Sequence, residues 1–248
     1  MSGRAGQPPR RLAPRPHSDT AQSAMVPTHP LDRPVWHALT GRQALLAQGD
    51  DRGLRFDPEY APFAAAPDPA DLTALVDLAR NGPLWLVEKQ QIIPPRGLKI
   101  TRSAECLQMI AGAVSKGARD HVFCDLGHAD ADEMLALARL TQPGPFSTKT
   151  YRFGHFIGIR EHGKLLAMAG ERMKPGGYTE LSGVCCHPDY RGRGYAGFLM
   201  RVVASRILAR GEIPFLHCYA TNKGAVALYQ SLGFTIHQNI MASILTPD

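Results

Sequence analysis

The stretch from Val184 to Gly197 has the residue types that bind phosphate groups in proteins. It reads VCCHPDYRGRGYAG and joins a predicted strand to a predicted helix through a short loop. The N-terminus of a helix presents unpaired N–H groups and partial positive charge, and glycines let the backbone approach a pyrophosphate closely. Arg191 and Arg193 add formal charge. Because no Gly-Lys-Ser or Gly-Lys-Thr occurs, this is not a nucleoside-triphosphatase phosphate loop.

A second pattern lies downstream and contains Asn222, Ala225, Leu228-Tyr229 and Leu232-Gly233-Phe234. Together with Arg191-x-x-Gly194-x-Ala196, it resembles the acyl-CoA signature of the GCN5-related N-acetyltransferase (GNAT) superfamily. The similarity is to the FR47-like branch, and it extends over residues 120–246. It implies an α/β acyl-CoA N-acyltransferase fold, in which a mixed, mostly antiparallel sheet is flanked by helices and preceded by an N-terminal α/β extension.

The resemblance implies that acetyl-CoA is the cosubstrate. The strand before the signature would splay from the next one, and the pantetheine arm would pair with its free backbone groups like an added strand. The pyrophosphate would rest on N–H groups of the glycine loop, and Asn222 would bind pantetheine or cap the last helix. The implied cofactor-binding residues are Val184, Cys185, Cys186, Arg191, Gly192, Arg193, Gly194, Tyr195, Ala196, Gly197 and Asn222.

Three residues are the candidates for catalysis by direct attack of an amine on the thioester. The resemblance places Tyr229 near the sulfur, where a neutral phenol can protonate the departing thiolate. Glu180 is the first candidate base, expected on the same strand face as Ser182 and Val184. His217 is the second; other superfamily members have a glutamate there, so this histidine is a departure, although imidazole is chemically able.

The coarse secondary structure of residues 121–248 is β-α-β-β-β-α-β-α-β. We expect a helix opened by a capping box of Asp130 and Glu133, and a closing strand over 234–245. Before this region we expect helices over 35–48 and from Asp68 to residue 80, strands at 84–88 and 98–101, and a short helix after Ser103.

Composition indicates that residues 1–30 are a basic, Pro/Arg-rich arm predicted to be disordered. The resemblance implies that residues 113–248 are the acetyltransferase domain and residues 31–112 an N-terminal segment or degenerate GNAT-like half. Three of the six net positive charges belong to the arm, so the remainder does not favour a nucleic-acid partner. No apolar run could cross a membrane, and five scattered cysteines favour the cytoplasm over a disulfide framework.

The sequence therefore predicts a cytoplasmic N-acetyltransferase that moves an acetyl or short acyl group from CoA to a primary amine in a ternary complex. No metal is expected, because the histidines lack ligand spacing. Two alternatives stay open: an amino-acid N-acyltransferase using larger acyl groups, and a non-catalytic acyl-CoA-binding regulatory module. The acceptor amine and the oligomeric state are not specified by the sequence.

Overall fold

The computed structural model describes residues 29–117 and 119–248, and the predicted disordered arm lies outside these residues except for its last two positions. Eight strands form one sheet in the order β4-β11-β5-β10-β9-β8-β7-β6, and β1-β2-β3 form a second, small sheet. The large-sheet strands are β4 (Leu84–Glu88), β5 (Leu98–Ile110), β6 (Cys124–Leu126), β7 (Phe156–Glu161), β8 (Lys164–Glu171), β9 (Tyr178–Cys186), β10 (Ile213–Tyr219) and β11 (Thr235–Pro247). The small sheet comprises β1 (Ala47–Asp50), β2 (Gly53–Phe56) and β3 (Ala64–Ala65).

The large sheet is mixed and mostly antiparallel, as predicted. All of its strand pairs are antiparallel except β9 and β10, which run parallel. A parallel pair needs a crossover connection, and the connection here is the helix α4 (Tyr195–Ala209). The one parallel pair is therefore also the place where the glycine loop enters the fold.

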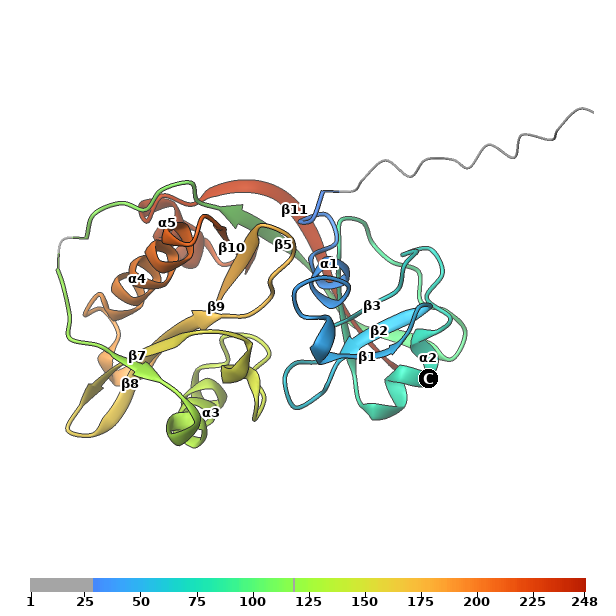
Figure 1. Cartoon of the computed structure of the whole chain (residues 1–248), viewed down its shortest axis with the longest axis horizontal. Coiled ribbons are helices and arrows are strands. Elements are labelled where there is room, and N and C mark those ends of the chain that lie inside the picture. The colour runs from blue at the N-terminus through green and yellow to red at the C-terminus, as the bar shows by residue number, and fades with distance from the viewer. Residues whose placement is uncertain (1–28, 118) are drawn as a thin grey trace, which may run out of the picture.

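Helices cover both faces of this sheet (Figure 1). On one face α4 and α5 (Lys223–Ser231) pack over Ile157 and Ile159 of β7. On the other, α3 (Ala131–Thr141) packs against Phe156. Alternate residues of β7 thus supply two separate cores, which is the period-two pattern of a strand buried on both sides.

The N-terminal segment differs from its prediction at both helices. In place of the helix expected over 35–48 the structure has the shorter helix α1 (Pro34–Leu39). The helix ends early because the Gln43 side chain hydrogen-bonds the backbone of Arg172 and Lys174. The helix expected from Asp68 is only α2 (Leu75–Leu78), since the Asp68 carboxylate accepts a hydrogen bond from Ala70 N in a local turn.

The short helix expected after Ser103 is also wrong, because that segment continues β5 as far as Ile110. It pairs with β11 on one side and with β10 on the other, so a central sheet position overrides the local helical preference. Asp130 does not form the expected capping box with Glu133 at the beginning of α3, because its carboxylate is used one turn earlier. Asp130 accepts from Gly127 N at 2.9 Å and pairs with Arg160, so it closes the preceding turn.

The large sheet is continuous between the two segments separated at residues 112 and 113. Strands β4 and β5 of the first segment pair with β11 and β10 of the second, and β11 curves across both halves of the molecule in Figure 1. A consequence for function is that side chains from β5 face those of the candidate site.

Candidate active site

Strands β9 and β10 part in the middle of the sheet. Their pairing runs from Tyr178 opposite Ile213 only as far as Glu180 opposite Phe215, and no later residues of the two strands are paired. The C-terminal half of β9, including Val184, therefore keeps an edge free toward β10. This is the splayed arrangement that the resemblance to the acyl-CoA signature predicted.

A bulge in β9 shapes this edge. Met168 pairs with Cys185 and Gly170 with Ser182, so one intervening residue of β8 lies opposite two of β9, Gly183 and Val184. The extra residue is accommodated at Gly183, whose φ of 63° suits glycine because it has no Cβ.

The bulge corrects one prediction about Glu180. Strict alternation would place Glu180, Ser182 and Val184 on one face, but Val184 packs in the same core as Leu181, the neighbour of Glu180. The interrupted alternation moves Val184 to the face of α4. Glu180 instead faces Arg172 and His217.

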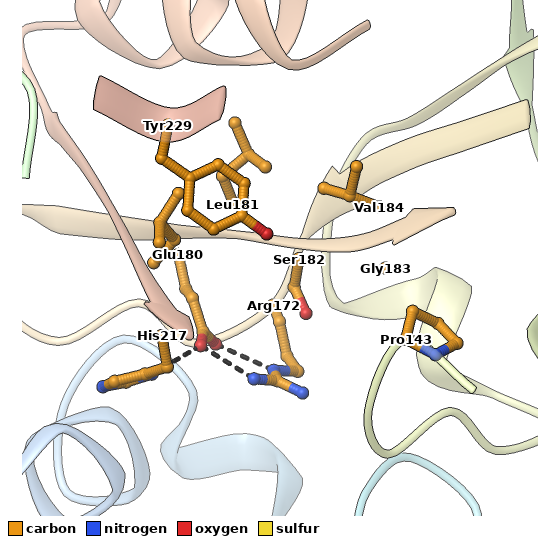
Figure 2. A pocket seen from close by; sticks show the side chains of 10 residues that line it. Pro143, Arg172, Glu180, Leu181, Ser182, Gly183, Val184, His217 and Tyr229 are labelled. Atoms are coloured by element: carbon orange, nitrogen blue, oxygen red, sulfur yellow. Dashed lines mark hydrogen bonds and ion pairs between the residues drawn. The ribbon is translucent and has the colours of Figure 1, made fainter. Parts of the chain in front are cut away.

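A small cavity of about 60 Å³ lies at the point where β9 and β10 part (Figure 2). It brings together all three predicted catalytic residues, Tyr229, Glu180 and His217, and the predicted cofactor residue Val184. The complete lining is Pro143, Arg172, Glu180, Leu181, Ser182, Gly183, Val184, Leu216, His217 and Tyr229.

Glu180 is buried and fully engaged. Its Oε2 accepts from Arg172 Nε at 2.8 Å and from Met173 N at 3.3 Å, while Oε1 accepts from Arg172 Nη2 at 2.7 Å. The same Oε1 lies 2.8 Å from Nδ1 of His217. Burial alone would raise the pKa of Glu180, but the charge and hydrogen bonds of Arg172, helped by His217, hold that pKa at about 2. The carboxylate is therefore ionised at neutral pH.

His217 is held from its other side by an amide network. Its Nε2 lies 3.0 Å from Nε2 of Gln108, a fully buried residue of β5. The Gln108 amide also donates to Leu31 O, and its oxygen accepts from Gln238. Because an amide nitrogen only donates, His217 Nε2 accepts and Nδ1 donates to Glu180. The network thus fixes which ring nitrogen of His217 donates and which accepts.

The Tyr229 side chain comes down from α5 into the cavity, and its hydroxyl points toward Ser182 (Figure 2). Within the described part of the chain this hydroxyl has no hydrogen-bond partner. Burial raises the pKa of Tyr229 to about 12, with a smaller contribution from Cys218. At neutral pH the residue is therefore an uncharged phenol with a proton to donate.

The glycine loop directly follows β9 and forms the beginning of α4. Gly192 and Gly194 have φ of 78° and 84°, and Gly194 is the N-cap residue of the helix. Arg191 and Arg193 are exposed, and Arg193 lies over the Tyr190 ring. Positive φ angles at successive glycines turn backbone N–H groups to one side, as an anion site requires.

The glycines at 192, 194 and 197 also match the Gly-x-Gly-x-x-Gly spacing of dinucleotide-binding folds. That motif belongs to parallel, doubly wound sheets. Here β9 and β10 are a single parallel pair in an otherwise antiparallel sheet, and they diverge after three residue pairs. The fold therefore does not support the dinucleotide interpretation.

Several predicted cofactor residues have structural contacts as well. Tyr195 is buried in the α4 core and its hydroxyl donates to Glu161, so only its backbone faces the loop. Gly197 faces α5, where a Cβ would lie 3.5 Å from Leu228. Asn222 caps α5 by accepting from Ala225 N at 3.2 Å, one of the two roles expected for it.

The two cysteines at the end of β9 point to opposite cores. Cys185 packs beside α3 and burial raises its thiol pKa to about 11, while Cys186 packs toward α4 and burial also raises its pKa. Both thiols are therefore poorly ionised at neutral pH, and what they can offer an extended ligand is their backbone. Ala196 follows in the first turn of α4.

Arg172 and Gln108 are the residues that sequence reasoning missed. Arg172 could have been found, because the turn residues Pro175-Gly176-Gly177 bring it back opposite Glu180, and an Arg–Glu pair across a hairpin is a recognisable charge pattern. Gln108 carried no usable signal, since its segment was expected to be helical and its partners lie on β10 and β11.

Residues 29–117 and 119–248 contain no group of three or more His, Cys, Asp or Glu side chains placed to hold a metal ion. None of their helices is both long and apolar enough to cross a bilayer.

Known proteins resemble this chain in both sequence and structure. A model of the FR47-like protein family matches residues 156–241. A solved structure from Novosphingobium aromaticivorans, assigned to the GNAT family as an acetyltransferase, is 45% identical, with a TM-score of 0.84 over 89% of this chain and 100% of its own. A GCN5-related N-acetyltransferase from Kribbella flavida shares the fold at 17% identity, covering 86% of this chain and 93% of its own, with a TM-score of 0.58.

One curated relative is N-alpha-acetyltransferase RimI of Mycobacterium tuberculosis, 36% identical over 84 residues. The match takes in 32% of this chain and spans about half of that relative's length (51%). The class of protein that these likenesses define is the N-acetyltransferases. The chain belongs to the GNAT family.

Proposed function

We propose that this protein transfers the acetyl group of acetyl-CoA to a primary amine, by direct attack of the amine on the thioester in a ternary complex. The observation that carries the proposal is the gap between β9 and β10. It combines a free strand edge, a glycine loop at the start of α4 and the unpartnered hydroxyl of Tyr229 in one continuous region.

The cosubstrate would lie along this gap. The pantetheine arm would pair with backbone groups of Val184, Cys185 and Cys186, in the way that an extended peptide adds to a sheet edge. The pyrophosphate would rest on N–H groups from residues 192–197, and the arginines of the loop would add charge attraction. Asn222 uses its oxygen as the cap of α5, so its amide nitrogen is the group left for pantetheine.

The size of the cavity favours a short acyl group. Its volume of about 60 Å³ is well below the ~150 Å³ of an engineered cavity that holds benzene. A two-carbon acetyl group leaves more of this space for the acceptor than a ring or a long chain would. The larger-acyl alternative thus has no specific observation in its favour.

The chemistry needs one proton removed and one supplied. The amine nitrogen forms a bond to the carbonyl carbon, the carbon–sulfur bond breaks, and Tyr229 gives its proton to the thiolate. The proton that the amine loses is assigned to Nε2 of His217, which exchanges the hydrogen bond from Gln108 for this proton. Because Glu180 stays ionised, its negative charge stabilises the imidazolium that forms rather than binding a proton itself.

Calorimetric titration with acetyl-CoA tests the first half of the proposal. Wild-type protein should bind with a Kd of about 1 μM, or about −8 kcal/mol. The Gly194→Glu variant should lose binding, because its carboxylate repels the pyrophosphate. Gly194→Ala is the matched control, since it has the same strained φ without the charge and should retain measurable binding.

Turnover tests the second half, by release of free CoA thiol in the presence of a panel of amines. Acetylated amine in the product confirms the enzyme. Binding restricted to longer acyl-CoA species would favour the larger-acyl alternative instead. Binding of acetyl-CoA with no turnover on any amine would support the regulatory module, and no binding of any CoA species would end the proposal.

A further inference from the structure

The polar groups that line the cavity fall into two sets. The carboxylate of Glu180 and both ring nitrogens of His217 are occupied by hydrogen bonds within the protein. In the described part of the chain, three other groups have no partner: the Tyr229 hydroxyl, the Ser182 hydroxyl and Nη1 of Arg172. Each of these three groups keeps some solvent-exposed surface, so each is accessible to a ligand.

The guanidinium of Arg172 is held in place by contacts that leave one edge open. Its Nε and Nη2 are used by Glu180, at 2.8 and 2.7 Å. Phe63 packs against its face, with the guanidinium carbon 4.7 Å from the ring centroid. Nη1 points away from Glu180, toward the side of the cavity where Pro143 lies (Figure 2). Two N–H donors are thus presented in a fixed direction.

Ser182 supplies a second donor on the same side. It precedes the bulge at Gly183, and its hydroxyl points to the side of β9 on which Arg172 lies (Figure 2). It is half-buried and lines the same cavity as Tyr229 and Arg172. A cation and a hydroxyl that converge beside the acid of the reaction form a recognition site for an oxygen anion.

The cavity offers no free acceptor group that could bind an ammonium ion in a comparable way. Glu180 is the one carboxylate in its lining, and four donors already saturate it. Binding energy for an acceptor must therefore come from the part of the molecule that is not the amine. A carboxylate fits best, because hydrogen bonds between two ionised groups are roughly twice as strong as neutral ones.

Resting on the proposed acetyl transfer, we propose that the acceptor is a small amino acid, and that Arg172 and Ser182 bind its carboxylate. Binding of the carboxylate at Nη1 of Arg172 and Oγ of Ser182 directs the adjacent amine toward the thioester near Tyr229. Arg172 and Ser182 are thus the residues that determine acceptor specificity. The N-terminus of a peptide, whose carboxylate is remote, would gain nothing from this site.

Matched acceptors test the assignment at saturating acetyl-CoA. L-Alanine and L-alaninamide differ only in the carboxylate, and at neutral pH the amide has more free amine, so a preference for alanine cannot come from amine ionisation. Wild-type kcat/KM should be at least about tenfold higher for alanine, the value expected for a charge-assisted hydrogen-bonded pair. Ser182→Ala and Arg172→Lys should each reduce this ratio, and Arg172→Lys should bring it close to one.

Two controls separate recognition from folding. Ser205→Ala and Arg139→Lys make the same changes at exposed helix positions and should keep the wild-type ratio. Ser182→Ala leaves the Arg172–Glu180 pair untouched, so it remains informative if Arg172→Lys fails to fold. In each variant the titration with acetyl-CoA should match wild type.

The outcomes distinguish this inference from the function on which it rests. If wild type acetylates alaninamide, or a peptide beginning with alanine, as fast as alanine, the carboxylate site is wrong while acetyl transfer stands. An unchanged ratio in both variants would overturn the roles of Arg172 and Ser182. If no amine is acetylated although acetyl-CoA binds, the proposed function fails, and the acceptor assignment fails with it.

Discussion

Oε1 of Glu180 lies 2.8 Å from Nδ1 of His217, and this contact joins β9 to β10 where the two strands part. Glu180 is the final residue of β9 that is paired with β10, opposite Phe215, and His217 lies two residues further along β10. The buried carboxylate therefore links the two strands just beyond their last pair, in addition to its proposed chemistry.

The ionisation of Glu180 predicts an acid-dependent loss of stability. Its pKa is about 2 when folded against a reference value of 4.5, so the unfolded chain takes up the proton first. The stabilisation is fully present above about pH 4.5 and is lost as pH falls toward 2. The Glu180→Gln variant should be about 3–5 kcal/mol less stable at pH 7, because it leaves Arg172 buried without its counter-charge.

Chemical denaturation across this pH range measures the difference. The difference in free energy of unfolding between wild type and Glu180→Gln should become smaller as pH falls from about 5 to 2. Glu133→Gln is the surface control: it removes a half-exposed ion pair with Arg160 and should cost at most about 1 kcal/mol. A free-energy difference that stays constant with pH would show that Glu180 is not ionised in the folded protein.

Removing the Tyr229 hydroxyl should slow chemistry without weakening cosubstrate binding. Tyr229→Phe keeps the ring but deletes the proton donor, so kcat should fall by about 100-fold or more. The calorimetric Kd for acetyl-CoA should stay nearly unchanged. Since burial keeps the pKa of Tyr229 at about 12, its ionisation should not produce a basic limb in the wild-type rate profile below about pH 11. Tyr60→Phe, in the N-terminal segment, is the control; equal rates for the two variants would exclude Tyr229 as the acid.

The bulge at Gly183 should be intolerant of a side chain. A Cβ at this position would lie 2.8 Å from the Phe156 ring, and φ is 63°. Gly183→Ala should therefore lower the free energy of unfolding by about 2–3 kcal/mol and weaken acetyl-CoA binding. Gly163→Ala has a φ of 79° in open space and should cost about 1 kcal/mol, with binding intact. Equal losses at both positions would mean that the bulge does not matter to the site.

Gln108 should act as a positioning residue for His217. Gln108→Leu leaves Nε2 of His217 without the Gln108 amide, while the oxygen of Leu31 keeps its hydrogen bond from Gln238, and stability should fall by about 1–3 kcal/mol. The variant should also lower kcat while leaving the Kd for acetyl-CoA nearly unchanged, a difference that lost packing alone would not produce. Gln230→Leu, exposed on α5, should change neither stability nor kcat. An unchanged kcat in Gln108→Leu would leave Gln108 with a purely structural role.

Local patterns in the sequence determined much of the cosubstrate half of this protein. The order β-α-β-β-β-α-β-α-β expected for residues 121–248 is the observed order of β6 to β11 with α3 to α5, because each element has its own hydrophobic period and its own turn residues. Gly194 and Asn222 occupy the N-caps of α4 and α5 for local reasons, because glycine tolerates a φ of 84° and the Asn222 side chain accepts from Ala225 N. The divergence of β9 and β10 was anticipated through the resemblance, not from spacing.

Tertiary structure alone decided the other half. Residues 103–110 became a central strand because β10 and β11 are available on both sides of it, and strand pairing depends on partners that are remote in sequence. The same pairing brings Gln108 to His217, while the bulge at Gly183 moves Val184 away from the face of Glu180. The sequence by itself supplied the candidates Glu180, His217 and Tyr229. Which of their polar atoms are occupied, and which groups beside them remain open to a substrate, depends on side chains from four strands, one helix and the loop after β8, which meet in one place.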